Sequence, residues 1–381
     1  NLNKLLIRIL LHLQVEFSSL NRWDMKSNYK RLGDYIRQVD VRNRDLAVER
    51  LLGLSVNKQF IPSIANTIGT DMSNYKVVAP SQFVYIADTS RRGDKIAIAL
   101  LGGQGKAIVS AIYTVFEITN EMELLPEYLM MWFRRPEFDR YARFKSHGSA
   151  REVFEWSEMC EVLLPIPPIE EQRKIVAQYQ AIERRIENNR RLIAALEETT
   201  QTIYRKIFVD NVDVENLPEG WQIGTLGDVA AFKNGKAIQP INGEIPVYGG
   251  NGIVGRHNSH NAVNIIVIGR VGANCGNIQI EREKCWVNDN AMMAVAKNGA
   301  LYYLYWLLST LNLNSKSEGS SQPLLTQTIL TQLDCVIPTR DAILHFNKIA
   351  EVIEIENIQK RKEIGVLTEL QSLVLSKMGT I

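Results

Sequence analysis

Basic and amide side chains recur in glycine-containing loops of this 381-residue chain. Arginine and lysine can contact guanine edges and phosphates, and asparagine and glutamine can contact adenine edges. Each such residue alone is typical of a solvated loop, but their clustering in two parts of the chain favours a nucleic-acid contact surface. The candidates in the first part are Lys58, Gln59, Arg91, Arg92 and Lys95, and those in the second part are Lys233, Lys236, Arg256, Asn258, Arg270 and Asn274.

A lysine-serine motif occurs twice and adds to these candidates. Its first copy contributes Lys145, Ser146, Gly148 and Ser149, and its second copy, 171 residues later (316 − 145), contributes Lys316, Ser317, Gly319 and Ser320. The tripeptide Leu-Gly-Asp at residues 32–34 also returns, at residues 226–228. Solenoid repeats have periods of about 20 to 50 residues, so this much longer spacing predicts two similar domains, which we call the first and second heads.

Sequence motifs for catalysis are missing. Residues 102–107 lack the first glycine and the final hydroxyl of a GxxxxGK[ST] phosphate loop, and no HExxH or GxSxG motif occurs. His257 and His260 have no credible third metal ligand nearby. The Asn/Asp-Pro-Pro-Tyr/Phe tetrapeptide of amino-methyltransferases is also missing. We therefore expect a non-catalytic chain that holds no cofactor and no metal of its own.

Composition indicates an ordinary globular protein. Hydrophobic residues make up 45% of the chain and the formal net charge is +2, so an anionic partner must be met by local patches rather than by bulk charge. Four cysteines without a CxxC pair favour buried thiols in a reducing, cytoplasmic compartment. The apolar run within residues 1–24 is interrupted by Arg8 and His12 and is shorter than the ~20 residues that span a bilayer. We interpret residues 1–24 as a leader or a cloning-derived extension.

Each head is expected to mix helix and strand. In the first head, short apolar runs bounded by turn residues predict strands at 76–78, 83–86, 94–100 and 107–118, followed by a helix at about 126–133. The second head repeats this plan with strands at 245–248, 264–268 and 291–295 and a helix at 302–308. The predicted class is therefore α+β.

Two long helices are the strongest structural prediction. Apolar residues recur in alternating steps of four and three, which is a heptad pattern. The first pattern predicts a helix over residues 169–208, roughly 60 Å long at about 1.5 Å per residue. The two helices can pair with each other, antiparallel in the simplest arrangement, or each can serve in dimerisation. The predicted seam residues are Ile175, Tyr179, Ile182, Ile186, Asn189, Ile193, Leu196, Ile203 and Ile207 in the first helix, and Phe346, Ile353, Asn357, Ile364, Leu367 and Val374 in the less regular second helix.

The order of these motifs resembles the DNA-specificity (S) subunit of type I restriction-modification systems. The most specific match is LPIPPIEEQRKIV at residues 164–176. The Leu-Gly-Asp openings of both heads, the lead-in LPEGW at 217–221 and the two Gly-Ser loops also match. The resemblance covers roughly residues 28–378.

This resemblance implies two mixed α/β target recognition domains in a pseudo-two-fold repeat, separated by two antiparallel coiled-coil helices. Each domain would read one half of a bipartite double-stranded DNA target, and the helices would dock two methyltransferase subunits. Those partners would bind S-adenosylmethionine, and restriction and translocase subunits would join them for cleavage. The second copy lacks the proline-rich, Glu-Glu-Gln lead-in at residues 336–343, which leaves open whether both halves dock equally.

The expected organisation follows the repeat along the chain. Two other functions stay open, namely a protein-binding coiled-coil scaffold and the recognition portion of a fused restriction-methylation enzyme. The predicted segments are 1–24 (leader), 25–164 (first recognition domain), 165–209 (first long helix), 210–338 (second recognition domain, with a linker at 210–222) and 339–381 (second long helix).

Overall fold

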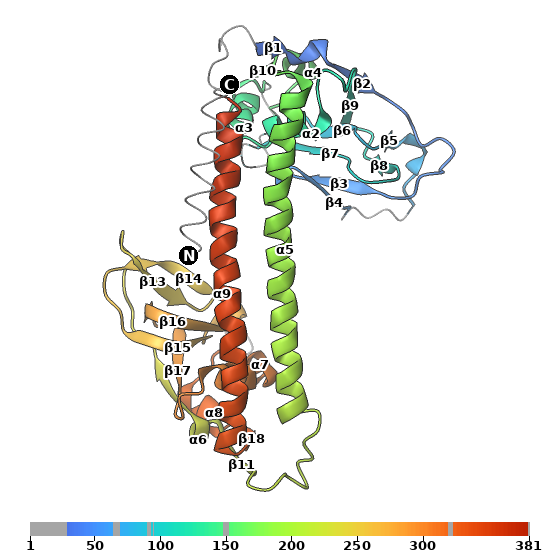
Figure 1. The fold of residues 1–381 in the computed structure, drawn as a ribbon. Helices are drawn as coiled ribbons and strands as arrows, with labels where there is room; N and C mark the ends of the chain where they lie inside the picture. The colour runs from blue at the N-terminus through green and yellow to red at the C-terminus, as the bar shows by residue number, and fades with distance from the viewer. Residues whose placement is uncertain are drawn as a thin grey trace. The chain divides into compact units, whose positions relative to one another are not determined.

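The computed structural model describes residues 29–63, 69–89, 93, 95–147, 152–318 and 323–379. The chain forms two compact units, Asn1–Asn188 with Glu363–Ile381, and Asn189–Lys362. Helices α5 (Ile169–Phe208) and α9 (Arg340–Lys377) each contribute to both units (Figure 1). The expected long helix over residues 169–208 is therefore confirmed. The units divide within the long helices and not at the ends of the heads, because each head packs against the adjoining halves of both helices.

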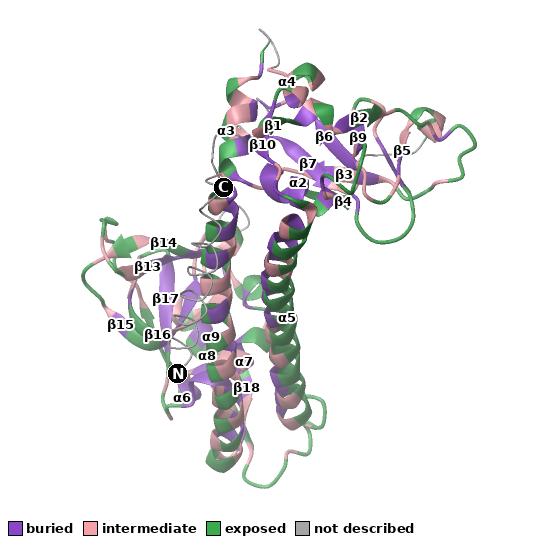
Figure 2. Cartoon of the chain, turned by 45° about the horizontal axis from the view of Figure 1, so that its top comes forward, coloured by how far each residue is buried: buried purple, intermediate pink, exposed green. Residues whose placement is uncertain are grey.

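The first head is built on a four-stranded antiparallel sheet. Its strand order is β2-β9-β6-β7 (Ile36–Val39, Thr114–Ile118, Phe83–Ile86 and Ala97–Leu100). Strands β6 and β7 are entirely apolar, and all of their residues except Leu100 are buried (Figure 2). Two smaller pairs are β3-β4 (Leu52–Ser55, Gln59–Pro62) and β5-β8 (Lys76–Val78, Ala107–Val109), and the helices are α2 (Pro126–Phe133), α3 (Pro136–Phe144) and α4 (Trp156–Cys160).

The second head repeats this sheet. The strands β12, β17, β15 and β16 have the same order and the same antiparallel pairing, and the hairpin β13-β14 extends the sheet to six strands. These strands span Ala230–Asn234, Ala291–Ala296, Ala262–Gly269, Ile278–Val287, Ile245–Gly249 and Gly252–His257, and the helices are α7 (Leu301–Thr310) and α8 (Gln327–Gln332). The expected α+β class with two similar mixed heads is confirmed.

The repeated Leu-Gly-Asp motif forms the same junction in both heads. It makes one tight turn, η1 (Leu32–Asp34) in the first head and α6 (Leu226–Val229) in the second. The leucine N–H donates to Val162 O in the first case and to Leu333 O in the second, both at 2.8 Å. A short strand pair precedes each long helix, β1-β10 (Tyr29–Arg31, Leu163–Pro165) and β11-β18 (Gln222–Thr225, Asp334–Ile337).

An amide side chain near the start of each long helix binds the head's short helix. Gln172 is fully buried and accepts the Leu125 N–H at 2.9 Å, at the start of α2. Asn347 accepts the Tyr302 N–H at 2.9 Å, at the start of α7. Helix starts leave N–H groups without a partner inside the helix, so these two amides fix each head to the helix that follows it.

Within each unit the segments of α5 and α9 run antiparallel. In the first unit, Arg185 Nε lies 2.7 Å from Glu363 Oε1, and Tyr179, earlier in α5, interacts with Gln371, later in α9. In the second unit, Arg361 Nη2 lies 2.6 Å from Glu197 Oε1, and Tyr204 contacts Phe346 at a ring distance of 5.4 Å. None of the helices in the described ranges is long and apolar enough to cross a membrane.

Two details of the sequence prediction are wrong. The single strand expected at 107–118 is two strands, β8 and β9, separated by a turn in which the Tyr113 N–H donates to Ser110 O. At the end of α5, Tyr204 and Phe208 are buried in place of the expected Ile203 and Ile207, which are partly buried. There the helix packs against the second head as well as against α9, so the buried face turns.

The remaining seam residues divide by burial. Polar Asn189 and Asn357 are among the buried ones, with Asn189 Nδ2 and Asn357 Oδ1 lacking a hydrogen-bond partner in the described structure. The buried apolar residues are Ile175, Tyr179, Ile182, Ile186, Phe346 and Val374, and the partly buried ones are Ile193, Leu196, Ile353, Ile364 and Leu367.

Candidate nucleic-acid interface

Two loops meet at one end of the first head's sheet. One loop follows β6 and begins at Ala87, and the other contains the lysine-serine motif. The Thr89 N–H donates to Glu152 O at 3.1 Å and the Phe154 N–H donates to Ala87 O at 2.8 Å. His147 and Val153 exchange two backbone hydrogen bonds, at 3.2 and 2.9 Å.

The second head makes the same four hydrogen bonds. The Gly272 N–H donates to Pro323 O at 3.0 Å, and the Leu325 N–H donates to Arg270 O at 2.9 Å. Glu318 and Leu324 exchange two bonds, at 3.0 and 2.8 Å. The repeated sequence motif therefore lies beside the same core strand in both heads, at the end of β6 in one and of β15 in the other. We call this arrangement the loop pair.

Lys145 and Ser146 of the lysine-serine motif have different surroundings in the loop pair of the first head. Lys145 lies beside the carboxylate of Glu158, with Nζ and Oε2 3.2 Å apart, and this hydrogen bond raises the pKa of Lys145. Ser146 is buried; its hydroxyl accepts from Thr89 Oγ1 at 2.9 Å and donates to Ala142 O at 2.6 Å. These hydrogen bonds join the two loops and give Ser146 a structural role; its predicted contact with DNA stays a prediction.

Lys58 is also a structural residue. Its side chain is only 6% exposed, and its ammonium donates to Ile96 O and pairs with Asp139. Burial lowers the pKa of Lys58, while the charge of Asp139 raises it. Breaking a buried ion pair is costly, so the pair with Asp139 favours a structural role for Lys58, and its predicted contact with DNA stays a prediction. Gln59 and Lys95 are exposed, and Arg91, Arg92, Gly148 and Ser149 lie outside the described residues.

In the second head, several predicted residues come together at the loop pair. Arg270 and Asn274 belong to the loop after β15, where Asn274 ends the turn η4 (Gly272–Asn274). This loop contacts the turn η5 (Leu313–Lys316), since Asn314 Nδ2 donates to Cys275 O at 2.8 Å. Lys316 is exposed there, and the Ser317 hydroxyl donates to Asn314 O at 2.7 Å.

The other predicted residues of the second head are distributed around its sheet. Lys236 is exposed beside the β16–β17 turn, where its N–H donates to Val287 O at 3.0 Å. Lys233 is exposed on β12. Arg256 and Asn258 are exposed at the other end of the β13-β14 hairpin, because Arg256 pairs with Pro246 near the start of β13. Gly319 and Ser320 lie outside the described residues.

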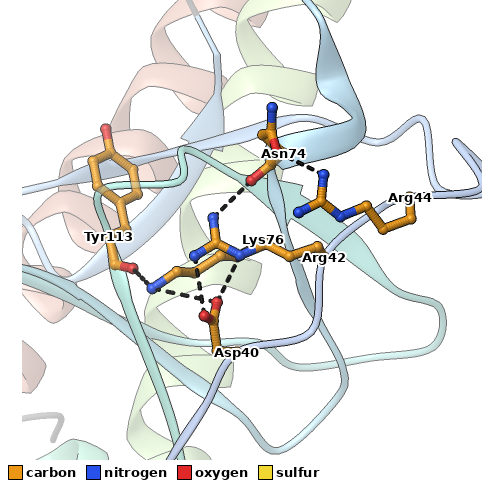
Figure 3. Close-up of polar contacts among 6 residues, drawn as sticks. All are labelled: Asp40, Arg42, Arg44, Asn74, Lys76 and Tyr113. Carbon is orange, nitrogen blue, oxygen red and sulfur yellow. Dashed lines mark hydrogen bonds and ion pairs between the residues drawn. The ribbon is translucent and has the colours of Figure 1, made fainter.

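A cluster of charged residues in the first head escaped the sequence analysis (Figure 3). Asp40 pairs with Arg42 at 2.8 Å and lies 3.8 Å from Lys76 Nζ. Asn74 accepts from both arginines, through its backbone O from Arg42 and its Oδ1 from Arg44, each at 2.8 Å. The exposed Arg44 guanidinium retains further N–H donors. The only signal in the sequence was that charged residues alternate with uncharged ones over residues 40–44.

Replacing Asp40 by asparagine is expected to destabilise the first head by at most about 1 kcal/mol at pH 7, because the carboxylate is largely exposed. The hydrogen bond from Arg42 and the charge of Lys76 hold the pKa of Asp40 below its usual value. The folded state therefore gains stability above the unfolded pKa of ~3.9 and loses it as the pH falls through the lower folded pKa. Thermal unfolding should show the difference between wild type and D40N shrinking below pH 4.

The control for D40N is Asp45→Asn. The Asp45 carboxylate accepts only the Ala47 N–H, at 3.3 Å, among the interactions of the described residues. D45N should therefore lack the pH-dependent difference. Equal pH profiles for the two variants would show that the pairs with Arg42 and Lys76 contribute nothing.

The described residues offer no group of three or more His, Cys, Asp or Glu that could hold a metal ion. His257 Nδ1 accepts the Ser259 N–H at 2.9 Å. The four cysteines are free thiols, and burial raises the pKa of Cys285 to about 12 and that of Cys335 to about 11. Thiols with such pKa values are protonated near neutral pH and are poor nucleophiles and metal ligands.

Comparison with known proteins supports one family. Residues 218–364 match the family model described as the type I restriction modification DNA specificity domain. The chain is 27% identical over 124 residues to the type I restriction enzyme MjaIX specificity subunit of Methanocaldococcus jannaschii, a match that covers 29% of each protein. It is 26% identical over 165 residues to the EcoprrI specificity subunit of Escherichia coli, covering 38% of this chain and 41% of that protein. These matches span less than half the length of either relative.

A solved structure shares the whole fold. The crystal structure of a type I restriction-modification S subunit from M. genitalium superposes with a TM-score of 0.61 at 16% identity, and covers 93% of this chain and 98% of that one. The matched domain lies in the second head and α9, and the first head repeats the second head's sheet and loop pair. The second head and part of α9 therefore match the type I restriction modification DNA specificity domain, and the chain is similar in sequence to curated type I specificity subunits and in fold to a type I S subunit.

Proposed function

We propose that this chain recognises a bipartite double-stranded DNA sequence, with one half-site read by each head. The observation that carries this proposal is the loop pair, which the same four backbone hydrogen bonds form in both heads. A protein that reads two half-sites needs two equivalent contact surfaces, because each half-site must present the same groove face to its head. Exposed Lys95, Lys236 and Lys316 near these loops supply groups that can bind phosphate.

The long helices are the proposed docking elements for two methyltransferase subunits. Each helix bears exposed apolar side chains: Leu192 on α5 is 40% exposed, and on α9 Val352 is 69% and Ile355 44% exposed. Residues three apart lie on one helix face, so Val352 and Ile355 form a small apolar patch that a partner can cover. The chemistry would then belong to the partners, which would bind S-adenosylmethionine and methylate adenine, while restriction and translocase subunits would add cleavage. This chain would contribute specificity without catalysis.

The proposal is tested by expressing the chain with its cognate methyltransferase subunit in a host that lacks both. Methylated adenines are mapped across the host genome by single-molecule sequencing, and the methyltransferase alone serves as the control. We expect a single split motif that is methylated only when both proteins are present. If the two proteins co-purify and the genome stays unmethylated, the chain acts as a scaffold and the proposal fails.

A further inference from the structure

Four loops of the second head converge beside Arg270. They follow β13 (residues 250–251) and β15 (residues 270–277), connect β16 to β17 (residues 288–290), and lie between η5 and α8 (residues 317–318 and 323–325). The Arg270 N–H donates to Asn290 O at 3.1 Å, and the Asn288 N–H donates to Tyr248 O at 2.9 Å. Gly269 has no room for a Cβ, which would clash with Gly250 O and Asn274 O. The loops are therefore in direct contact at one end of the sheet.

The backbone of this surface is tightly constrained. Gly276 has a φ of +89°, and a Cβ there would lie 2.5 Å from Asn314 N. Its N–H donates to Gly269 O at 2.8 Å, and the Gly269 N–H donates to Asn277 O at 2.8 Å. Side chains carried by such a loop are held in place before a ligand arrives, which lowers the entropic cost of binding.

Two asparagine amides occupy the surface. Asn251 and Asn277 are both exposed, and Asn277 Nδ2 donates to Asn251 Oδ1 at 3.4 Å. An amide has two N–H donors and an oxygen with two lone pairs. The one long hydrogen bond therefore leaves each amide with a donor and an acceptor, which is the combination that binds the N6 and N7 atoms of adenine in the major groove.

Arg270 completes the set of polar groups. Its Nε is buried without a hydrogen-bond partner, and its Nη1 lies 3.5 Å from Asp289 O. Among the described residues it makes no ion pair within 4.0 Å. A guanidinium without a carboxylate can donate two parallel hydrogen bonds to O6 and N7 of guanine.

The charge of the surface favours contacts with base edges over contacts with the phosphate backbone alone. The exposed carboxylates Asp289 and Glu318 belong to two of the four loops and equal the cations Arg270 and Lys316 in number. A nearly balanced patch gains little from the release of counterions. Its remaining binding capacity lies in directed donors and acceptors, which discriminate between bases.

We propose that Asn251, Asn277 and Arg270 form the base-reading surface of the second head, with the amides contacting adenine and the guanidinium contacting guanine. This inference rests on the proposed function. It also predicts that the two heads read different bases, because Ala87 occupies the position of Arg270 in the loop pair of the first head. The second half-site should therefore contain an adenine and a guanine that these side chains select.

The test measures methylation of DNA duplexes by the complex of this chain with its methyltransferase. The duplexes carry every single-base change in the motif that the wild-type complex methylates. Losing a bidentate base contact should reduce the preference for the correct base about 10- to 100-fold. We expect this loss at one or two positions of the second half-site for N251A/N277A and at another position for R270A, with the first half-site unchanged.

Two further variants distinguish base reading from a structural role. The substitution Asn277→Asp replaces the amide with a carboxylate that offers only acceptors, so it should shift the preference at its position from adenine toward cytosine. The control N242A removes an exposed asparagine that precedes β13, at the opposite end of that strand from Asn251, and should leave the motif unchanged. All variants change exposed or partly exposed residues, so their thermal unfolding midpoints should match that of the wild type.

The outcomes separate this inference from the proposed function. Without any chain-dependent motif in the wild-type complex, the proposed function itself fails. With a wild-type motif in hand, unchanged second half-site preferences in N251A/N277A and R270A overturn the inference. Altered preferences in the first half-site would overturn it as well.

Discussion

Replacing Phe346 by alanine is expected to lower the free energy of unfolding of the second unit by about 3–5 kcal/mol, the usual cost of removing a buried phenylalanine. Phe346 is 0% exposed in α9, and its ring lies 5.4 Å from that of Tyr204 and 5.6 Å from that of Phe208, both in α5. Its loss leaves a cavity where the two helices and the second head meet. Chemical denaturation followed by circular dichroism measures the change.

The matched control is Phe144→Ala in the first head. Phe144 is 80% exposed at the end of α3, and surface substitutions usually change stability by less than about 0.5 kcal/mol. If F346A destabilises the protein no more than F144A does, then the aromatic cluster of Tyr204, Phe208 and Phe346 does not hold the second head to the helices.

The long helices and the repeat could be predicted because both signals are local or periodic. The heptad pattern that starts at Ile175 predicted a helix with the same bounds as α5, Ile169–Phe208. The recurring Leu-Gly-Asp motif forms equivalent turns in the two heads. Periodicity failed at Tyr204 and Phe208 for a physical reason. A heptad describes a helix that packs on one partner, whereas the end of α5 packs on both α9 and the second head.

The roles of single polar residues could not be predicted from their types. From its residue type, Lys58 was expected to be a solvent-exposed lysine in a loop. In the structure it pairs with Asp139, which is 81 residues away in the sequence. Ser146 belongs to a repeated motif, but its hydroxyl joins two loops. In both cases a contact between residues far apart in the sequence gives the side chain a structural role. A single sequence does not reveal such contacts.

The amides of the second head were missed because they come from separate loops. Asn251 lies between two glycines and Asn277 follows Gly276, and such Asn-Gly combinations are typical of turns. Only the strand order of the sheet brings the ends of β13 and β15 together. A sequence search for asparagines next to a glycine in the loops after predicted strands would have included both residues.

Exchanging one head for the other should have the largest effect on function. The loop-pair hydrogen bonds align Phe154 with Leu325, and the core strands align Ile36 with Ala230. We therefore expect that replacing residues 36–154 with residues 230–325 keeps the junction strands β1 and β10 and gives a chain with two second heads. The complex of this chimera with the methyltransferase should no longer methylate the original motif, because every base contact of the first half-site is lost, at about 1–3 kcal/mol for each mismatched base pair.

The methylome of this chimera, expressed with the methyltransferase, tests most directly whether each head reads one half-site. The reciprocal chimera, with residues 36–154 in place of 230–325, covers the case in which the first chimera does not fold. We predict that one half of the motif stays unchanged and that the other half becomes a second copy of it. A motif in which both halves change, or one that remains identical to the wild-type motif, would contradict the account.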